Sequence, residues 1–202
     1  MEIGLFPLGL VLLPTEQVPL HIFEPRYREL IGECLEEEQP FGLVYADDDG
    51  LRRIGTLATV VDVTDRFEDG RLNIVVEGGG RFRLVDLTDG RSFHTGTIEA
   101  LDDVHDPPPA TDVERALAVF RRLVDLTGAE VDVPAEVTGQ PSFEIGSRFE
   151  LAPELKLELL EETSERRRLV RLCEILETIA DAVERQREVA ALAQKNGKAK
   201  PA

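Results

Sequence analysis

A run of prolines divides this sequence into two parts with different hydrophobic patterns. Residues 1–104 contain short apolar segments in which apolar and polar residues alternate, which is the period of β-strands. Residues 105–110 contain three consecutive prolines and form a stiff linker. Residues 111–193 show apolar residues spaced three and four apart, the period of helices, and the small, polar residues 194–202 are expected to be a disordered tail. This order of patterns predicts the α+β class, with a β domain followed by an α-helical bundle.

The segment Leu5–Leu30 supplies the first strands and the helix that packs on them. Its apolar runs at Ile3–Leu8 and Leu10–Leu13 are broken by proline and glycine, and their length fits buried strands. Val18–Phe23 predicts a third strand, and its internal proline places that strand at a sheet edge or at a strand start. A helix is expected to begin near Glu24, because the proline that follows suits the first helical position.

Further strands are expected before the linker. They lie at Phe41–Ala46, Ile54–Phe67, Arg71–Glu77, Arg81–Leu87 and Phe93–Leu101. Asp69-Gly70 is a strong two-residue hairpin signal. The glycines at 78–80 predict a tight turn and not a phosphate-binding loop, because a strand follows them where such a loop needs a helix. Roughly seven strands around one helix point to a small mixed β-barrel.

Alternation also predicts which side chains share a face. In the strand Ile54–Phe67, the residues predicted on one face are Leu57, Thr59, Val61 and Val63. In the strand Arg71–Glu77 they are Leu72, Ile74 and Val76.

The helical part is expected to contain several helices. Short helices are predicted at about 143–150 and 153–162. The last helix is predicted to start after Ser164 and to run to about Ala193. Its apolar residues repeat in alternating steps of three and four from Leu169 to Ala190, a narrow seam of the kind that packs helix on helix. We expect this seam to pack within its own bundle, which gives a monomer, with a weak coiled-coil homodimer as the alternative.

The net charge of −17, from 40 acidic and 23 basic residues, restricts the partners of the chain. Such a field repels phosphate backbones and anionic lipid headgroups, so it argues against nucleic-acid and membrane binding. The basic run Arg166–Arg168 follows several glutamates and lacks interleaved aromatic residues, so we expect ion pairs on a solvated helix face. Cys34 and Cys173 occupy apolar helical positions, as unpaired thiols do in a reducing cytosol. The apolar N-terminal run is too short to span a bilayer, and we expect a soluble, cytoplasmic protein.

The sequence offers no set of residues for catalysis. His21, His94 and His105 have no partners at metal-ligand spacing. No serine lies in a G-x-S-x-G elbow, and no P-loop is present. We therefore expect a non-enzymatic protein with no metal and no cofactor.

Several short motifs in the first half are specific. Leu5–Leu8 reads LFPL and Pro19–Arg28 reads PLHIFEPRYR. Phe41–Val44 reads FGLV, and Val76–Phe82 contains a glycine–arginine turn. Together these motifs resemble stand-alone Lon N-terminal (substrate-binding) domain proteins, and the resemblance covers most of residues 1–103.

The resemblance implies a PUA-like mixed β-barrel with one packed helix, followed by a helical bundle that ends in a long helix. In full-length ATP-dependent Lon proteases this region helps to recognise unfolded or degron-bearing protein substrates. The implied function is a protein- or peptide-binding module, an adaptor in protein quality control that works with a separate ATP-dependent protease. The AAA+ ATPase and Ser-Lys protease modules of those enzymes are absent from these 202 residues. RNA or nucleotide recognition through the PUA-like barrel is the alternative, which rests on fold analogy alone and which the net charge opposes.

The groove between barrel and bundle is the predicted binding site, because clefts between domains are favoured pockets. The residues predicted to contact a ligand lie at the first strand–helix join and in the glycine–arginine turn: His21, Phe23, Glu24, Arg26, Tyr27 and Arg81. The alternative for each is a structural role, with Phe23 and Tyr27 in the core and Glu24 paired with Arg26 or Arg81. On that alternative, Arg81→Ala lowers stability before it affects binding.

Overall fold

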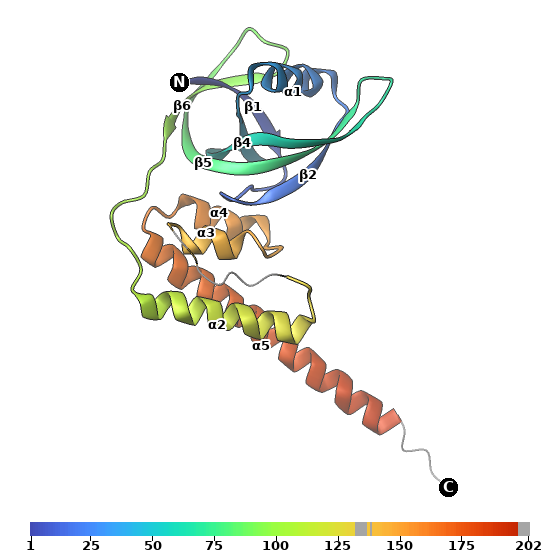
Figure 1. Ribbon diagram of the computed structural model, residues 1–202, viewed down its shortest axis with the longest axis vertical. Helices are drawn as coiled ribbons and strands as arrows, with labels where there is room; N and C mark the ends of the chain where they lie inside the picture. The colour runs from blue at the N-terminus through green and yellow to red at the C-terminus, as the bar shows by residue number, and fades with distance from the viewer. Residues whose placement is uncertain (132–136, 138, 198–202) are drawn as a thin grey trace.

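The computed structural model describes residues 1–131, 137 and 139–197. Within these residues the chain forms six strands and five helices. Figure 1 shows a β-barrel with one helix packed against the side away from the bundle, and below it a bundle from which a long helix projects. The α+β class and the long last helix are therefore confirmed.

The strands close into a barrel of mixed direction. They are β1 (Glu2–Leu8), β2 (Gln17–Ile22), β3 (Phe41–Asp47), β4 (Gly50–Arg66), β5 (Leu72–Thr88) and β6 (His94–Ala100). The sheet order is β2-β5-β4-β3-β1-β6, and an additional pairing of β5 with β6 closes the barrel. β1 and β3 are parallel, whereas all other pairs are antiparallel. β2 lies at the sheet edge, as its proline predicts.

The helix α1 (Pro25–Glu37) covers one side of the barrel. Pro25 occupies its first turn, where a missing N–H is harmless. Tyr27, Leu30 and Ile31 are its buried residues, and they pack into a core cluster with Phe6 and other strand residues. The predicted helix and its packing on the strands are therefore confirmed.

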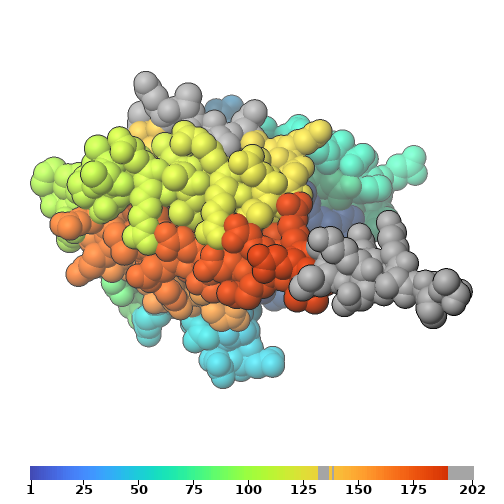
Figure 2. All heavy atoms as spheres, turned by 90° about the horizontal axis from the view of Figure 1, so that it is seen from below, coloured from blue at the N-terminus to red at the C-terminus, as the bar shows by residue number. Residues whose placement is uncertain are grey.

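The bundle consists of α2 (Ala110–Thr127), α3 (Pro141–Gly146), α4 (Pro153–Glu161) and α5 (Glu165–Gly197). Figure 2 shows α2 and α5 side by side across the face turned away from the barrel. Leu169, Leu172 and Leu176 of the predicted seam are buried against α2 and α3, so this part of the seam packs within the bundle. α5 continues past the predicted end at Ala193, and residues 198–202 of the predicted tail lie outside the described residues.

The predicted strand at Leu10–Leu13 is wrong. These residues are a loop whose backbone groups bond to side chains instead of to a neighbouring strand. The Leu12 carbonyl accepts a 2.6 Å hydrogen bond from Thr56 Oγ1, and the Leu13 N–H donates to Glu16 Oε2 at 2.9 Å. The run is apolar because its side chains are buried, so composition alone could not separate it from a strand.

One continuous strand, β5, replaces the two strands and the tight turn predicted around residues 78–80. Gly78 lets this strand pass close to the loop before β2. Its N–H donates to the Glu16 carbonyl at 2.9 Å, and its carbonyl accepts from the Thr15 N–H at 2.7 Å. A Cβ atom on Gly78 would overlap the Leu13 carbonyl, so only glycine fits. The predicted turn is wrong because this glycine serves a close approach of two segments and not a chain reversal.

The predicted face of β4 is wrong as well. Thr56 and Ala58 are buried, whereas Thr59 and Val61 are exposed. Register shifts against β5 interrupt the ladder at three places, beginning between Thr56 and Ala58. Each such bulge changes which side chains point inward, so simple alternation does not follow one face of this strand.

A buried ion pair fixes the loop before β2 to the bundle. Glu16 and Lys156 of α4 are both nearly buried and form this pair. Lys156 Nζ also lies 3.5 Å from the Val11 carbonyl. The pair joins the barrel to the bundle at a point where neither charge can be solvated by bulk water.

We predict that Glu16→Ala lowers the free energy of unfolding by about 3–5 kcal/mol, because it leaves the Lys156 ammonium buried without its carboxylate. Urea unfolding at pH 7 measures the change. Glu161→Ala, at an exposed position of α4, is the control and shifts stability by less than about 0.5 kcal/mol. The double variant Glu16→Gln with Lys156→Met recovers much of the loss. Equal stabilities of Glu16→Ala and the wild type would contradict this assignment.

Candidate functional site

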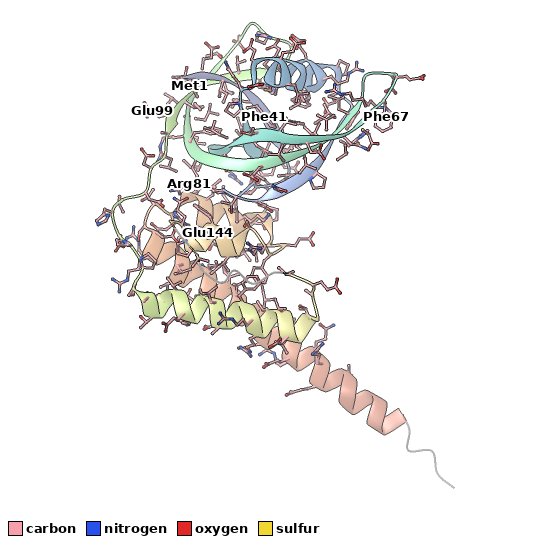
Figure 3. The ribbon with its side chains drawn as sticks, in the orientation of Figure 1. Met1, Phe41, Phe67, Arg81, Glu99 and Glu144 are labelled. Atoms are coloured by element: carbon pink, nitrogen blue, oxygen red, sulfur yellow. The ribbon has the colours of Figure 1, made fainter. Side chains whose placement is uncertain are left out.

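A groove of about 480 Å³ lies at the end of the barrel that faces the bundle. Its lining comes from the N-terminal residue, β4, β5, β6, the segment that leaves the barrel, and two loops. The residues are Met1, Pro14, Leu57, Gly79, Gly80, Arg81, Phe82, Ile98, Ala100, Leu101, Asp102, Asp103 and Gln140. Figure 3 shows Arg81 on the side of the barrel that faces the bundle.

The floor of the groove is apolar because it belongs to the barrel core. Phe82 and Ile98 are buried members of one core cluster, and Leu57 packs against the same cluster. The groove therefore opens into the end of the barrel. An apolar side chain placed there would leave water and contact side chains that are already held by the core.

A cluster of buried charges forms the wall between barrel and bundle. Arg81 forms an ion pair with Asp103, and its Nη1 donates to the carbonyls of Leu160 and Glu162 at 2.6 and 2.9 Å. Arg168 of α5 is fully buried and pairs with the same carboxylate, Nη2 to Oδ2 at 2.6 Å. One carboxylate thus holds a guanidinium from the barrel and another from the bundle.

Neighbouring groups complete this cluster. Arg168 also pairs with Glu165, and its Nε donates to Ser142 Oγ at 2.7 Å. Ser142 Oγ in turn lies 2.8 Å from Glu165 Oε2. Both guanidinium groups lie over the ring of Phe143, with centroid distances of 5.3 Å for Arg81 and 4.0 Å for Arg168. Two cations and two carboxylates therefore balance each other around one aromatic ring.

The charges of this cluster shift the pKa values of its members. Burial acts to raise the pKa of Asp103, but hydrogen bonds and charge from Arg168, together with the charge of Arg81, outweigh it and hold the pKa below its ordinary value. The pKa of Arg81 is lowered, first by burial and then by the nearby charge of Arg168. Asp103 is therefore a stable carboxylate that anchors both arginines.

Asp102 is the solvent-facing carboxylate of the groove. Its side chain is exposed, whereas the neighbouring Asp103 is occupied by two arginines and by Gln140. Among the lining residues, all of which the structure describes, Asp102 is the acidic group without an ion-pair partner. It gives the rim of an apolar groove a negative charge.

The structure separates the predicted site residues into three places. Arg81 lies at the groove. His21 and Phe23 lie at the C-terminal end of β2, beside Phe67 of the β4–β5 hairpin. The ring of His21 stacks with Phe23 at 5.9 Å and meets Phe67 edge-on at 6.0 Å. Phe23 is 59% exposed and Phe67 39% exposed. Figure 3 shows Phe67 at the opposite end of the barrel from Arg81.

The remaining predicted residues lie at the start of α1. Glu24 and Arg26 form a half-exposed ion pair at 2.8 Å. Tyr27 is buried and stacks on Phe6 at 4.0 Å, and burial raises its pKa. A binding role for this group stays a prediction, and it concerns a surface that is separate from the groove.

Arg168 is the residue that sequence reasoning missed. Arg166 and Arg167 are exposed as predicted, but the prediction of a solvated face is wrong for Arg168. The signal was present, because Arg168 precedes Leu172 by four residues and therefore lies on the apolar face of α5. A buried arginine on such a face needs carboxylates from elsewhere in the chain, and only the fold shows that Asp103 supplies one.

Other chemistry is absent from the part of the chain that the structure describes. That part contains no group of three or more His, Cys, Asp or Glu side chains that could hold a metal ion. Cys34 and Cys173 are free, and burial raises the pKa of both thiols to about 11, which keeps them protonated and unreactive. None of the described helices is both long and apolar enough to cross a membrane.

We predict that Asp103→Asn lowers the free energy of unfolding at pH 7 by about 3–5 kcal/mol, because two buried guanidinium groups lose a shared carboxylate. The folded pKa of Asp103 lies below its unfolded value, so the stability it contributes is complete above about pH 4 and is lost as the pH falls through the folded pKa. The gap between wild type and variant therefore narrows below about pH 4. Urea unfolding from pH 7 to pH 3 tests this, with the exposed Asp89→Asn as control. A gap that does not change with pH would overturn the assignment.

Comparison with solved structures supports the fold. A crystal structure of a Lon N-terminal domain protein from Xanthomonas campestris is 26% identical and superposes with a TM-score of 0.65, covering 85% of this chain and 96% of that one. The N-terminal domain of a Mycobacterium avium complex Lon protease gives a TM-score of 0.68 at 16% identity, covering 88% of this chain and 98% of that one. The second likeness shows the fold alone.

Sequence comparison extends the same relationship. A Lon protease from Paraburkholderia phytofirmans is 28% identical in an alignment of 204 positions that covers 93% of this chain. Lon protease 1 from Hydrogenovibrio crunogenus is 25% identical in an alignment of 197 positions that covers 89% of this chain. The chain spans 24% of the length of each of these relatives. The family model of the ATP-dependent protease La (LON) substrate-binding domain matches residues 2–178. The chain belongs to the LON substrate-binding domain family.

Proposed function

We propose that this chain binds unfolded or degron-bearing protein segments in the groove at the end of the barrel. The observation that carries the proposal is the combination of an apolar floor, made by Leu57, Phe82 and Ile98, with the unpaired carboxylate of Asp102 at the rim. Folded proteins bury most of their large apolar side chains, whereas unfolded segments offer them. Membership of a substrate-binding domain family supports this reading.

The groove favours an apolar side chain next to a basic one. Complete burial of one large apolar side chain contributes about 1.5–3 kcal/mol. A lysine or arginine near Asp102 adds a smaller, salt-dependent attraction, of about 0.2–1 kcal/mol. These magnitudes predict weak binding to each segment and tolerance of many sequences, which suits a protein that examines unfolded chains.

Binding alone neither unfolds nor cleaves a client. Since these 202 residues are a binding domain, we infer that the chain acts as an adaptor in protein quality control and passes its clients to an ATP-dependent protease module. We place it in the cytoplasm, where its two free cysteines stay reduced. We expect a monomer or a weak homodimer, because the first half of the α5 seam is already buried within its own bundle.

We predict that Ala100→Trp blocks the groove. Ala100 is exposed at the groove, so the indole enters it without disturbing the core. Affinity for a fluorescently labelled protein that is permanently unfolded by reduction and alkylation falls by about tenfold or more, which corresponds to exclusion of one apolar side chain. Fluorescence anisotropy measures this change.

The control is Glu99→Trp, the same bulk at an exposed neighbouring position that does not line the groove. Adjacent strand residues point to opposite faces, so this variant leaves the groove open and keeps its affinity. Equal binding by Ala100→Trp and the wild type would place the site elsewhere.

We predict that Asp102→Asn weakens binding of a lysine-containing apolar peptide by about two- to fivefold at low salt. The exposed carboxylate acts through solvent, so the difference from wild type shrinks as ionic strength rises to 0.5 M. A peptide with glutamine in place of lysine binds both proteins equally. The control Asp89→Asn keeps the wild-type affinity, and a similar loss in that variant would mean that the effect comes from net charge and not from the groove.

A further inference from the structure

Strand β5 changes partners beside the groove. On one edge it pairs with β4 along most of its length, with a bulge at which Gly79 and Gly80 together lie opposite Leu57. On its other edge it pairs first with β2, ending at Glu77 opposite Gln17, and later with β6, starting at Phe82 opposite Ala100. A strand has two edges, so β2 and β6 must share this second edge in succession.

Two residues lie in the gap between these partners. The bonds of Gly78 to the loop before β2 extend the first pairing by one residue, and the bond from the Leu101 N–H to the Arg81 carbonyl extends the second. In the register of the described strands, Gly79 and Gly80 have no partner in β2 or β6. Both glycines are exposed and both line the groove.

The fold itself does not require glycine at these two positions. Neither has a positive φ angle. A Cβ atom on Gly79 would lie 3.4 Å from the Leu57 carbonyl oxygen, and one on Gly80 would lie 3.9 Å from Leu57 Cδ1, which are ordinary contacts. Gly78 differs, because the loop before β2 leaves no room for its side chain. Because neither glycine carries a side chain, the β5 backbone is exposed at the groove.

We propose that the groove recognises the main chain of its occupant: an extended client segment adds to the open edge of β5 at Gly79 and Gly80. This inference rests on the proposed function and states that the site recognises its ligand through main-chain hydrogen bonds. The segment lies between Pro14 on one side and Leu101 on the other, in the gap that β2 and β6 leave. Its side chains on one face enter the apolar floor, and a basic residue reaches Asp102.

Main-chain pairing explains how one groove can accept many sequences. Every residue except proline carries the same N–H and carbonyl groups, so pairing with β5 does not depend on side-chain identity. A gap of two residues accommodates a short stretch of strand, about 7 Å of rise. The occupant needs an extended backbone with unpaired groups, which unfolded segments supply and which folded proteins mostly keep paired or protected.

The test uses the peptide Lys-Thr-Val-Leu-Val-Thr-Lys with a fluorescent label and the whole protein. Its backbone amides are N-methylated one at a time, which removes a donor and leaves the side chains intact. Successive N–H groups of a strand point to opposite edges, and the gap on β5 spans only two residues, so main-chain pairing uses one N–H group of the peptide. N-methylation at one central position weakens binding by about tenfold, and N-methylation at the two positions beside it has little effect.

A variant of the protein tests the same edge. Gly80→Val adds a branched side chain that strands tolerate and that obstructs the approach of a peptide backbone, so affinity for the parent peptide falls by about tenfold. Gly9→Val is the matched control, since Gly9 is also exposed and has room for a side chain but lies outside the groove. Thermal unfolding confirms that both variants are folded. The peptide series on the wild type remains decisive if Gly80→Val fails to fold.

The outcomes separate this inference from the proposed function. If the parent peptide binds, Ala100→Trp blocks it, and one central N-methyl peptide loses affinity while those methylated beside it do not, both stand. If the parent peptide binds and Ala100→Trp blocks it, but all N-methyl peptides bind alike, the groove is the site and main-chain recognition is overturned. If neither the parent peptide nor an unfolded protein binds at the groove, the proposed function falls and this inference falls with it.

Discussion

The shared carboxylate of Asp103 is the constraint on which the arrangement of the molecule depends. It accepts Arg81 from a barrel strand and Arg168 from the last helix, and it lies just after β6, where the chain leaves the barrel. These ion pairs therefore fix the direction in which the chain departs and the position of the bundle beneath the barrel. The groove depends on this arrangement, because Gln140 and the departing segment line it together with the barrel strands.

Buried charges are a costly way to join two parts of a protein, and apolar contacts of the same volume often stabilise as well or better. What the charges add is direction. Guanidinium and carboxylate groups bond at defined angles, whereas the apolar contact of Phe143 alone would permit sliding. The separate pair of Glu16 and Lys156 joins barrel and bundle at a second point. We interpret the two contacts together as a device that sets one orientation, and so one groove shape, more than as a source of stability.

Local patterns predicted the elements whose determinants are local. The hairpin at Asp69-Gly70, the start of α1 at a proline and the helical period of α5 all depend on residues close in sequence, and they are present. The hairpin loop is longer than the predicted two residues, because the bond from the Phe67 N–H to the Arg71 carbonyl encloses three. The loop at Leu10–Leu13 and the continuous β5 strand were missed because their determinants are distant. Thr56 and Glu16 bond the loop backbone, and a neighbouring loop explains Gly78. The same holds for the candidate site: Arg81 was predicted from a motif, but its partner Asp103 and the buried Arg168 become neighbours only through the tertiary fold.

The three consecutive glycines show why a motif does not by itself locate a site. The sequence predicts a single turn at this motif, but glycine occurs at its three positions for different physical reasons. Gly78 is fixed by the architecture, since a side chain there would overlap the Leu13 carbonyl, whereas Gly79 and Gly80 have room for a side chain and lie on an open strand edge. A residue that the fold requires carries no information about ligands. Glycines that the fold does not require, at the place where a strand lacks a partner and a groove opens, indicate that the bare backbone itself is what a ligand meets.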